Sequence, residues 1–448
     1  MGRLFGTDGL RATPGEFPLD NATIELLGRI LYFLLADRNL VTEIIVGHDT
    51  RDSGPRIQDA IWRGFSGAGG VVQDAGVLPT PALAYLAKAQ QKCALSITAS
   101  HNAYPDNGIK IFGPDGFKMS ERTETEIEIY LLGEKPFTRE SELVTRVEIQ
   151  SMHEFYRSRY CRHLTDDLFP DLNLQGLRIA VDCANGALFE VPPLVLRKLG
   201  AEVVCFNAEP DGKNINDHCG SLYPDFLLAE LQKDHYDCGF SFDGDGDRCL
   251  AADCDAIYDG DHILGAAARY LQSLGRLKKN AVVATSMSNL GLEIFLRNLG
   301  ITLHRVPVGD KYVLEKLQQE DFSLGGEQSG HIIFMNDSFI GDGLITALQL
   351  LRIYKSLGLP FGRIWDGFRR FPQVLLNIRV KKKPDLESIP EIRSKKESIE
   401  RQLGASGRIV LRYSGTEMLT RIMIEGPDQN EIESMAHDLG EVIRNQLN

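Results

Sequence analysis

The sequence predicts a series of α/β units with largely parallel sheets, followed by a C-terminal unit of a different kind. Short apolar runs rich in β-branched residues recur, and each leads through a polar or glycine-containing turn into a helical pattern. Strand, loop and helix in this order are typical of parallel α/β domains. At roughly 150 residues per domain, 448 residues correspond to about three domains, or to four of about 100 residues.

Four strand-to-loop junctions show this pattern most clearly, at intervals the size of a domain. They are Ile44–Val46 before Gly47–Arg51, Ile179–Val181 before Asp182–Gly186, Val282–Ala284 before Thr285–Asn289, and Ile409–Leu411 before Arg412–Thr416. No sequence repeat relates them, so the predicted similarity is one of structure. We therefore predict three similar α/β units and a distinct fourth unit.

Three segments mark the predicted domain boundaries. The polar, largely helical stretch 143–163 ends the first unit, the end of the strand Cys249–Asp253 closes the second, and the segment 369–390 begins the fourth. The predicted domains are residues 1–152, 153–254, 255–368 and 369–448. The run Lys381–Lys383 in the last boundary segment is interpreted as a solvated turn.

The composition excludes several classes of protein. With 43% hydrophobic and 25% charged residues, the chain is expected to be globular rather than disordered. A net charge of −13 repels nucleic acids and acidic membranes, so we expect neither as a partner. The eight cysteines form no CxxC pair, and we recognise neither an apolar leader nor a membrane-spanning run. The sequence therefore predicts a cytoplasmic protein.

The segment Phe240–Arg248 contains three aspartates at alternate positions, Asp243, Asp245 and Asp247. The intervening glycines let the backbone fold closely, so the carboxylates converge and repel one another until a cation binds. Hard oxygen ligands of this kind suit octahedral Mg²⁺. An EF-hand is excluded, because Arg248 stands where that loop requires Gly. The segment also resembles haloacid-dehalogenase-like phosphatases, in which the first Asp is the nucleophile, and both interpretations imply Mg²⁺ and phosphate.

A second segment places Ser100 and His101 in a polar loop after a strand, with Lys110 close in sequence. A hydroxyl at a strand end can carry a phosphoryl group if a metal offsets its charge. A serine at such a place also serves as a helix cap or turn residue. No GxSxG elbow supports an acyl-transfer nucleophile here. These residues alone do not decide whether Ser100 carries a phosphoryl group or has a structural role.

Two further loops supply groups suited to a phosphorylated sugar. The first is a glycine-rich turn with Glu327, Ser329 and His331, whose carboxylate, hydroxyl and imidazole can bind sugar hydroxyls and move a proton. The second is Arg412–Glu417 with Arg421 beyond it, where guanidinium groups, hydroxyls and an exposed backbone make an anion nest. The second loop is neither a Walker A loop nor a GxGxxG fingerprint, so it does not imply a nucleotide.

Together and in this order, these segments resemble the α-D-phosphohexomutase family over nearly the whole chain. The resemblance begins at Gly6–Arg11. Three segments favour the amino-sugar branch over the phosphomannomutase/phosphoglucomutase branch, namely Gly6–Arg11, Val308–Val313 and Gly326–His331. It implies a four-domain architecture around a central cleft. Three domains share one α/β topology, and the C-terminal domain is an α+β fold similar to the TATA-binding protein.

The resemblance also implies roles for the site residues. Ser100 carries the phosphoryl group and, with Asp243, Asp245 and Asp247, holds Mg²⁺. Glu327 and Ser329 bind sugar hydroxyls. The non-reacting phosphate is bound by Arg412, Ser414, Gly415, Thr416 and Arg421. The groups expected to contact phosphate or to move protons are Arg11, His101, Lys110 and His331.

The implied reaction converts glucosamine 6-phosphate into glucosamine 1-phosphate through glucosamine 1,6-bisphosphate, which also serves as primer, and it feeds UDP-N-acetylglucosamine and cell-wall precursor synthesis. The alternatives are glucose or mannose phosphate as substrate, a Mg-dependent phosphatase with an aspartate nucleophile, and a sugar-phosphate sensor. The presence of Ser100 and all three aspartates argues against the sensor. The expected partner is a phosphorylated amino sugar, and the family allows a homodimer.

Two residues depart from the family pattern. Ala103 follows Ser-His-Asn where the family commonly has Pro, and Met418 follows Ser-Gly-Thr-Glu where Pro is frequent. Because Pro restricts φ, we expect both loops to be less rigid than in relatives with Pro. Neither change removes an assigned ligand.

Overall fold

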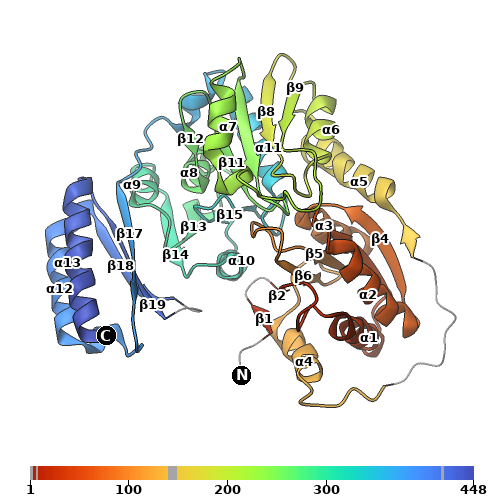
Figure 1. Ribbon diagram of the computed structural model, residues 1–448. Coiled ribbons are helices and arrows are strands. Elements are labelled where there is room, and N and C mark those ends of the chain that lie inside the picture. Colours follow the sequence, from red (N-terminus) through yellow and green to blue (C-terminus); the bar gives the residue numbers. More distant parts are fainter. Residues whose placement is uncertain (1–3, 7–8, 140–148, 415–417, 448) are drawn as a thin grey trace.

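The structure is a computed structural model that describes residues 4–6, 9–139, 149–414 and 418–447 (Figure 1). These residues form four β-sheets with helices packed against them. The first three sheets contain parallel strands, and the fourth is antiparallel. The predicted fold class of three α/β units and a C-terminal α+β unit is therefore confirmed. The boundaries at 152, 254 and 368 stay predictions.

The first sheet has the strand order β1-β2-β6-β5-β3-β4-β7 and is parallel at its centre. Ile44, Ile45 and Val46 of β3 are fully buried, because helices cover both faces of a parallel sheet. The strands are β1 (Phe5–Gly6), β2 (Gly9–Ala12), β3 (Glu43–His48), β4 (Val71–Val77), β5 (Cys93–Ile97), β6 (Asn107–Phe112) and β7 (Gln150–Ser151). The helices are α1 (Asn21–Asp37), α2 (Gly54–Gly67), α3 (Thr80–Gln90) and α4 (Glu121–Leu131).

The second and third sheets repeat the parallel arrangement with fewer strands. The second has the order β12-β11-β10-β8-β9, built from β8 (Arg178–Asp182), β9 (Glu202–Phe206), β10 (Cys238–Phe242), β11 (Cys249–Ala252) and β12 (Ile257–Tyr258). The third has the order β14-β13-β15-β16, built from β13 (Ala281–Thr285), β14 (Thr302–Val306), β15 (Leu324–Gly326) and β16 (Ile332–Phe334). The helices between Met152 and Gly358 are α5 (His153–Arg162), α6 (Val191–Lys198), α7 (Pro224–Leu231), α8 (Gly260–Ser273), α9 (Leu290–Asn298), α10 (Asp310–Gln319) and α11 (Gly343–Leu357).

The C-terminal unit lies at one end of the molecule, at the left of Figure 1. Its sheet has the order β17-β19-β18, with β17 (Gln373–Arg379), β18 (Arg408–Tyr413) and β19 (Leu419–Glu425). Helices α12 (Pro390–Leu403) and α13 (Gln429–Leu447) cover one face, and the other face turns toward the rest of the molecule (Figure 1).

Core packing separates the C-terminal unit from the other three. One continuous buried cluster includes Ile45, Ile179 and Val282, which come from the first three sheets. The C-terminal unit has its own cluster around Ile378 and Ile422. Its contacts with the third unit include polar ones, in which buried Glu425 accepts from the backbone N–H of Leu290 over 3.0 Å and from Nδ2 of Asn289 over 3.0 Å. The first three units are thus packed as one body, and the fourth is attached to it at a separate joint.

Parallel strands place their following loops at one edge of a sheet. β5 ends at Ile97 before the serine loop, β10 ends at Phe242 before the aspartate loop, and β15 ends at Gly326 before the Glu327 loop. Each loop therefore leaves the carboxyl end of a strand in a different sheet. Contacts between the three units bring the loops together.

Candidate active site

Three buried aspartates form a compact cluster directly after β10. The ligand oxygens of Asp243, Asp245 and Asp247 all lie within 4.8 Å of one another. Gly244 allows the loop to pack against the serine loop, because a Cβ at this position would lie 2.6 Å from the carbonyl oxygen of Ser100. The missing side chain therefore determines how closely the two loops approach.

Ser100 lies beside this cluster in the loop after β5. Its Oγ donates to Oδ2 of Asp243 over 2.8 Å and lies 3.2 Å from Nδ1 of His101. Its φ of +52° lies in the left-handed region, which a residue with a side chain adopts only where its surroundings hold it. One such contact is the hydrogen bond from the N–H of Ser100 to Oγ1 of Thr98, at 2.8 Å. The hydroxyl is thus directed at the aspartates by the backbone itself.

A buried ion pair at the end of β3 holds the serine loop in place. Nε of Arg51 lies 2.9 Å from Oδ2 of Asp49, and both side chains have no exposed surface. The same guanidinium donates to the carbonyl oxygens of Ser100, Asn102 and Ala103, over 3.1, 2.8 and 2.5 Å. One planar cation therefore contacts three backbone carbonyls of the loop that carries the hydroxyl.

Lys110 offsets part of the negative charge of the cluster. Its Nζ lies 2.9 Å from Oδ2 of Asp245 and 3.6 Å from Oδ2 of Asp247. Burial opposes ionisation of Asp247, but Lys110 and His331 outweigh it and hold the pKa of Asp247 well below its usual value. Burial and repulsion by the other two aspartates raise the pKa of Asp243 well above its usual value. Lys110 and His331 thus favour ionisation of Asp247, whereas ionisation of Asp243 stays unfavourable beside the other two carboxylates.

The donor set fits a magnesium ion. Oδ1 of Asp245 and Oδ1 of Asp247 are buried, and neither accepts a hydrogen bond from the described part of the chain. Buried charged oxygens without partners are costly, and a hard divalent cation satisfies them. Oγ of Ser100 lies next to the cluster, so the hydroxyl or a phosphate on it is placed to complete the coordination. The three aspartates and Ser100 are therefore the residues suited to hold Mg²⁺.

A cavity of about 440 Å³ opens beside the aspartates, within the size range of small-molecule sites. It is lined by groups from the first three units, among them Arg11, His101, Asp247, Asp310, Glu327 and His331. Nη1 of Arg11 donates to Oδ1 of Asn102 over 3.3 Å, which ties this arginine to the serine loop. Ser100 itself is buried, with 1% of its surface exposed, and its neighbour His101 lines the cavity.

The two histidines of this cavity have opposite electrostatic surroundings. Burial, with help from Arg248 and Arg11, lowers the pKa of His101 to about 4. Burial also opposes charge on His331, but Asp247, whose Oδ2 lies 3.6 Å from Nδ1, outweighs it and raises the pKa of His331. The cavity therefore contains one imidazole that is neutral and can accept a proton, and a second whose charged form is favoured and can donate one.

The loop Glu327–His331 is a tight turn that separates two cavities. The N–H of Glu327 donates to the carbonyl of His331 over 2.9 Å, and that of Gly330 donates to the carbonyl of Glu327 over 3.0 Å. Glu327 and His331 line the 440 Å³ cavity, whereas Ser329 lines an adjoining one of about 490 Å³. Arg248 lines both. Ser329 is therefore placed next to the main cavity rather than in it.

The predicted phosphate loop belongs to the C-terminal unit. Arg412 and Arg421 are cross-strand partners, and burial together with Arg421 lowers the pKa of Arg412. The N–H of Ser414 donates to the carbonyl of Leu419 over 2.8 Å, while Gly415 and Thr416 lie outside the described residues. Among the described residues, none of the C-terminal unit lines the 440 Å³ cavity. The structure thus joins the serine, aspartate and Glu327 loops and leaves the arginine pair apart from them.

Several groups that shape the site have no sequence pattern that predicts their role. Nδ2 of Asn216 donates to the carbonyl of Ser100 over 2.9 Å, and Oγ1 of Thr80 donates to Oδ2 of Asp245 over 2.8 Å. Both come from segments distant in sequence from the residues they hold. For Asp49 and Arg51, the available signal is the polar turn after an apolar strand.

No helix in the described ranges is both long and apolar enough to cross a lipid bilayer.

Comparisons with known proteins agree on one family. Models of the phosphoglucomutase/phosphomannomutase family match in order, with the α/β/α domains I, II and III at residues 2–136, 158–256 and 259–371 and the C-terminal domain at 375–442. The phosphoglucosamine mutase of Syntrophus aciditrophicus (strain SB) is 40% identical, with 100% of both chains covered. That of Desulforamulus reducens is 42% identical over 99% of this chain and 100% of its own.

Solved structures show the same fold. A phosphoglucomutase/phosphomannomutase family protein from Burkholderia thailandensis has a TM-score of 0.79 at 21% identity, covering 99% of this chain and 97% of its own. N-acetylphosphoglucosamine mutase from Aspergillus fumigatus, solved with GlcNAc-6P and magnesium, has a TM-score of 0.64 at 20% identity and covers 82% of this chain and 93% of its own. With full-length relatives at about 40% identity and all four family domains in order, the chain belongs to the phosphoglucomutase/phosphomannomutase family, the α-D-phosphohexomutases.

Proposed function

We propose that this protein interconverts glucosamine 6-phosphate and glucosamine 1-phosphate, with Ser100 as the phosphoryl carrier and glucosamine 1,6-bisphosphate as intermediate. The observation that carries the proposal is the contact of 2.8 Å between Oγ of Ser100 and the aspartate cluster at the edge of a 440 Å³ cavity. Full-length relatives at 40 to 42% identity are phosphoglucosamine mutases, which supports the amino sugar as substrate.

The reaction consists of two phosphoryl transfers of opposite direction. In the first, O1 of glucosamine 6-phosphate attacks the phosphorus of phospho-Ser100 and the O1 proton passes to a base. The bond from phosphorus to Oγ breaks, and Oγ takes up a proton. The bisphosphate then turns in the cavity. In the second transfer Oγ of Ser100 attacks the 6-phosphate, O6 leaves and takes up a proton, and glucosamine 1-phosphate and phospho-Ser100 result.

The residues around the cavity divide this work. Lys110 and Arg11 offset charge on the transferring oxygens, and Mg²⁺ at the aspartates, when bound, adds electrostatic stabilisation of that charge. Neutral His101, 3.2 Å from Oγ of Ser100, is placed to accept the serine proton. His331, whose charged form Asp247 favours, is placed to donate a proton to a sugar oxygen.

The remaining groups bind the sugar and its second phosphate. Glu327 binds sugar hydroxyls in the main cavity, and Ser329 binds them from the adjoining one. Arg412, Ser414, Gly415, Thr416 and Arg421 bind the non-reacting phosphate. Because the described residues of this set lie apart from the cavity, binding this phosphate requires the C-terminal unit to move toward it. A cytoplasmic location and a homodimer stay predictions.

The decisive experiment measures turnover and the phosphoenzyme together. Purified protein is incubated with Mg²⁺, glucosamine 6-phosphate and glucosamine 1,6-bisphosphate, and product, inorganic phosphate and phosphoserine are followed by phosphorus NMR and mass spectrometry. We expect glucosamine 1-phosphate without release of inorganic phosphate, and loss of both product and phosphoenzyme in Ser100→Ala. Steady phosphate release would identify a phosphatase, and turnover by S100A with loss of the phosphoenzyme in Asp243→Asn would identify an aspartate nucleophile.

The second candidate is a glucose or mannose phosphate mutase, favoured by the family models, which name phosphoglucomutase and phosphomannomutase. The ratio of kcat/KM between glucosamine, glucose and mannose 6-phosphates discriminates the two, because it measures the difference in transition-state binding. A preference for glucose or mannose would overturn the amino-sugar assignment and leave the mutase reaction intact.

A further inference from the structure

Asp310 is a carboxylate of the main cavity that belongs neither to the aspartate cluster nor to the groups proposed for hydroxyls. It is the first residue of α10 and lines the 440 Å³ cavity together with Glu327 and His331. Its Oδ1 accepts the N–H of Lys311 over 2.8 Å. A carboxylate at a helix N-terminus is stabilised in its charged form by the helix dipole. Asp310 therefore presents negative charge to the substrate.

The surroundings of Asp310 already accommodate a primary ammonium group. Nζ of Lys118, from the first unit, lies 2.6 Å from Oδ2 of Asp310. Lys118 lines a second cavity of about 690 Å³, between the first and third units, and is not among the residues that line the 440 Å³ cavity. Asp310 lines both cavities. The carboxylate of Asp310 therefore lies between the Lys118 ammonium group and the 440 Å³ cavity.

Two carboxylates lie close together at this end of the cavity. Oε1 of Glu327 accepts the N–H of Gly309 over 3.1 Å, which places a second carboxylate next to the segment that carries Asp310. Asp310 and Glu327 both act to favour the charged form of His331, which faces them. Among the described residues that line the cavity, the third carboxylate, Asp247, belongs to the cation cluster. Of these three carboxylates, Asp310 is thus the one with no assigned role, and it is suited to recognise a cationic group.

Amino sugar phosphates differ from glucose and mannose phosphates at C2, where an amine, largely protonated near pH 7, replaces a hydroxyl. A hydrogen bond between two charged groups is roughly twice as strong as one between neutral groups. We infer that Asp310 binds the C2 ammonium group of the substrate and determines the preference for the amino sugar. This inference rests on the proposed function and identifies the residue that recognises the C2 substituent of the sugar.

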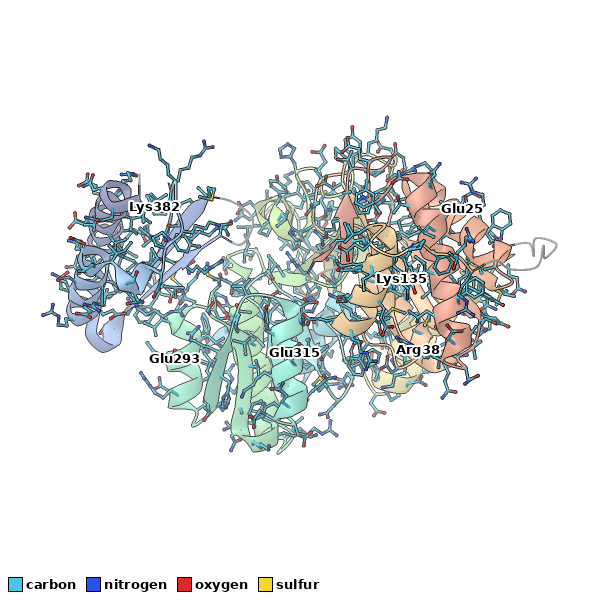
Figure 2. The ribbon with its side chains drawn as sticks, turned by 90° about the horizontal axis from the view of Figure 1, so that it is seen from below. Glu25, Arg38, Lys135, Glu293, Glu315 and Lys382 are labelled. Atoms are coloured by element: carbon cyan, nitrogen blue, oxygen red, sulfur yellow. The ribbon has the colours of Figure 1, made fainter. Side chains whose placement is uncertain are left out.

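The test compares kcat/KM for glucosamine 6-phosphate and glucose 6-phosphate in three variants. In Asp310→Asn we expect the ratio of the two values to fall about 10- to 100-fold, the loss typical of a charge-assisted hydrogen bond. Glu315→Gln is the matched control, because Glu315 lies on the same helix, pairs with Lys311 at 3.8 Å and is absent from the lining of the 440 Å³ cavity (Figure 2). Lys118→Met removes the ion pair and keeps the carboxylate. Both controls are expected to keep or raise the ratio.

The outcomes separate recognition from a structural role. If Asp310 merely ties the third unit to the first, D310N and K118M lower kcat/KM for both sugars by the same factor and the ratio stays constant, which overturns the inference. A wild-type enzyme without preference for glucosamine 6-phosphate overturns the proposed substrate and the inference with it. A wild-type preference that D310N retains overturns the inference alone.

A measurement on the wild-type enzyme makes the test independent of how well D310N folds. If the ammonium form is recognised, the ratio of kcat/KM for glucosamine over glucose 6-phosphate falls about tenfold per pH unit above the pKa of the C2 amine. A ratio that stays constant through that pKa contradicts recognition of the charged group.

Discussion

Replacing Arg51 by Met removes the cation at the centre of the serine loop. Arg51 and Asp49 have no exposed side-chain surface, and the guanidinium donates to three loop carbonyls. After the substitution Asp49 keeps the hydrogen bonds from Oγ1 of Thr98 at 2.6 Å and from the N–H of residue 51 at 3.0 Å, but it loses its counter-charge. The variant thus leaves a buried carboxylate without a cation and removes one donor from each of three loop carbonyls. Asn216 still donates to the carbonyls of Ser100 and Asn102, and the N–H of Asp106 still donates to that of Ala103.

The expected loss has two separable parts. Breaking a buried ion pair by removing one partner costs about 3–5 kcal/mol of unfolding free energy. Misplacement of the Ser100 hydroxyl lowers kcat by about 100-fold, because a shift of about 1 Å suffices for that. In the double variant Asp49→Asn/Arg51→Met the buried charge is gone, so we expect stability to recover in part. Activity should stay low, because the loop still lacks the guanidinium that joins its three carbonyls.

The assay follows urea unfolding of the first unit and turnover in parallel. The chain has two tryptophans, Trp62 in α2 and Trp365 in the third unit. In a Trp365→Phe background, fluorescence of Trp62 reports on the first unit, which avoids assigning one unfolding free energy to a multidomain chain. An R51M variant with the parental urea midpoint and kcat would refute the argument. Recovery of kcat in the double variant would refute the part concerning the loop.

Three further predictions follow from buried groups. Burial raises the pKa of Asp261 to about 7, so the folded protein keeps a proton that the unfolded chain loses above about pH 4. The unfolding free energy therefore falls by a total on the order of 4 kcal/mol between these pH values, and Asp261→Asn should remove this decrease in denaturation measured at several pH values. Mg²⁺ at 100 times its Kd should stabilise the wild-type protein by about 2.7 kcal/mol in thermal unfolding, and Asp245→Asn should abolish this shift, whereas an equal shift in both proteins would contradict the site. Gly244→Ala should lower kcat by more than about tenfold, because its Cβ would lie 2.6 Å from the carbonyl of Ser100, while Gly67→Ala, with open space around its Cβ, serves as the control.

The parts of the site that lie within one loop were open to prediction from the sequence. Asp243, Asp245 and Asp247 alternate with glycines, and this local pattern alone makes three carboxylates converge. The fold class follows in the same way, because apolar runs ending in polar turns are periodic along the chain. Ser100, by contrast, stands in a loop whose sequence also suits a plain turn.

Only the tertiary structure decided which distant residues these loops contact. These contacts join segments that are distant in sequence: Ser100 contacts Asp243 and Asn216 of the second unit and Arg51 of its own unit, and Asp310 of the third unit lines the same cavity. The sequence alone determined the chemistry of each loop, because backbone conformation and charge spacing are local properties of the chain. Which loops share a site depends on how separate sheets pack around one core, and contacts between distant segments have no local sequence signal. For the same reason, the separate core of the C-terminal unit, which leaves its arginine pair apart from the cavity, is visible only in the folded chain.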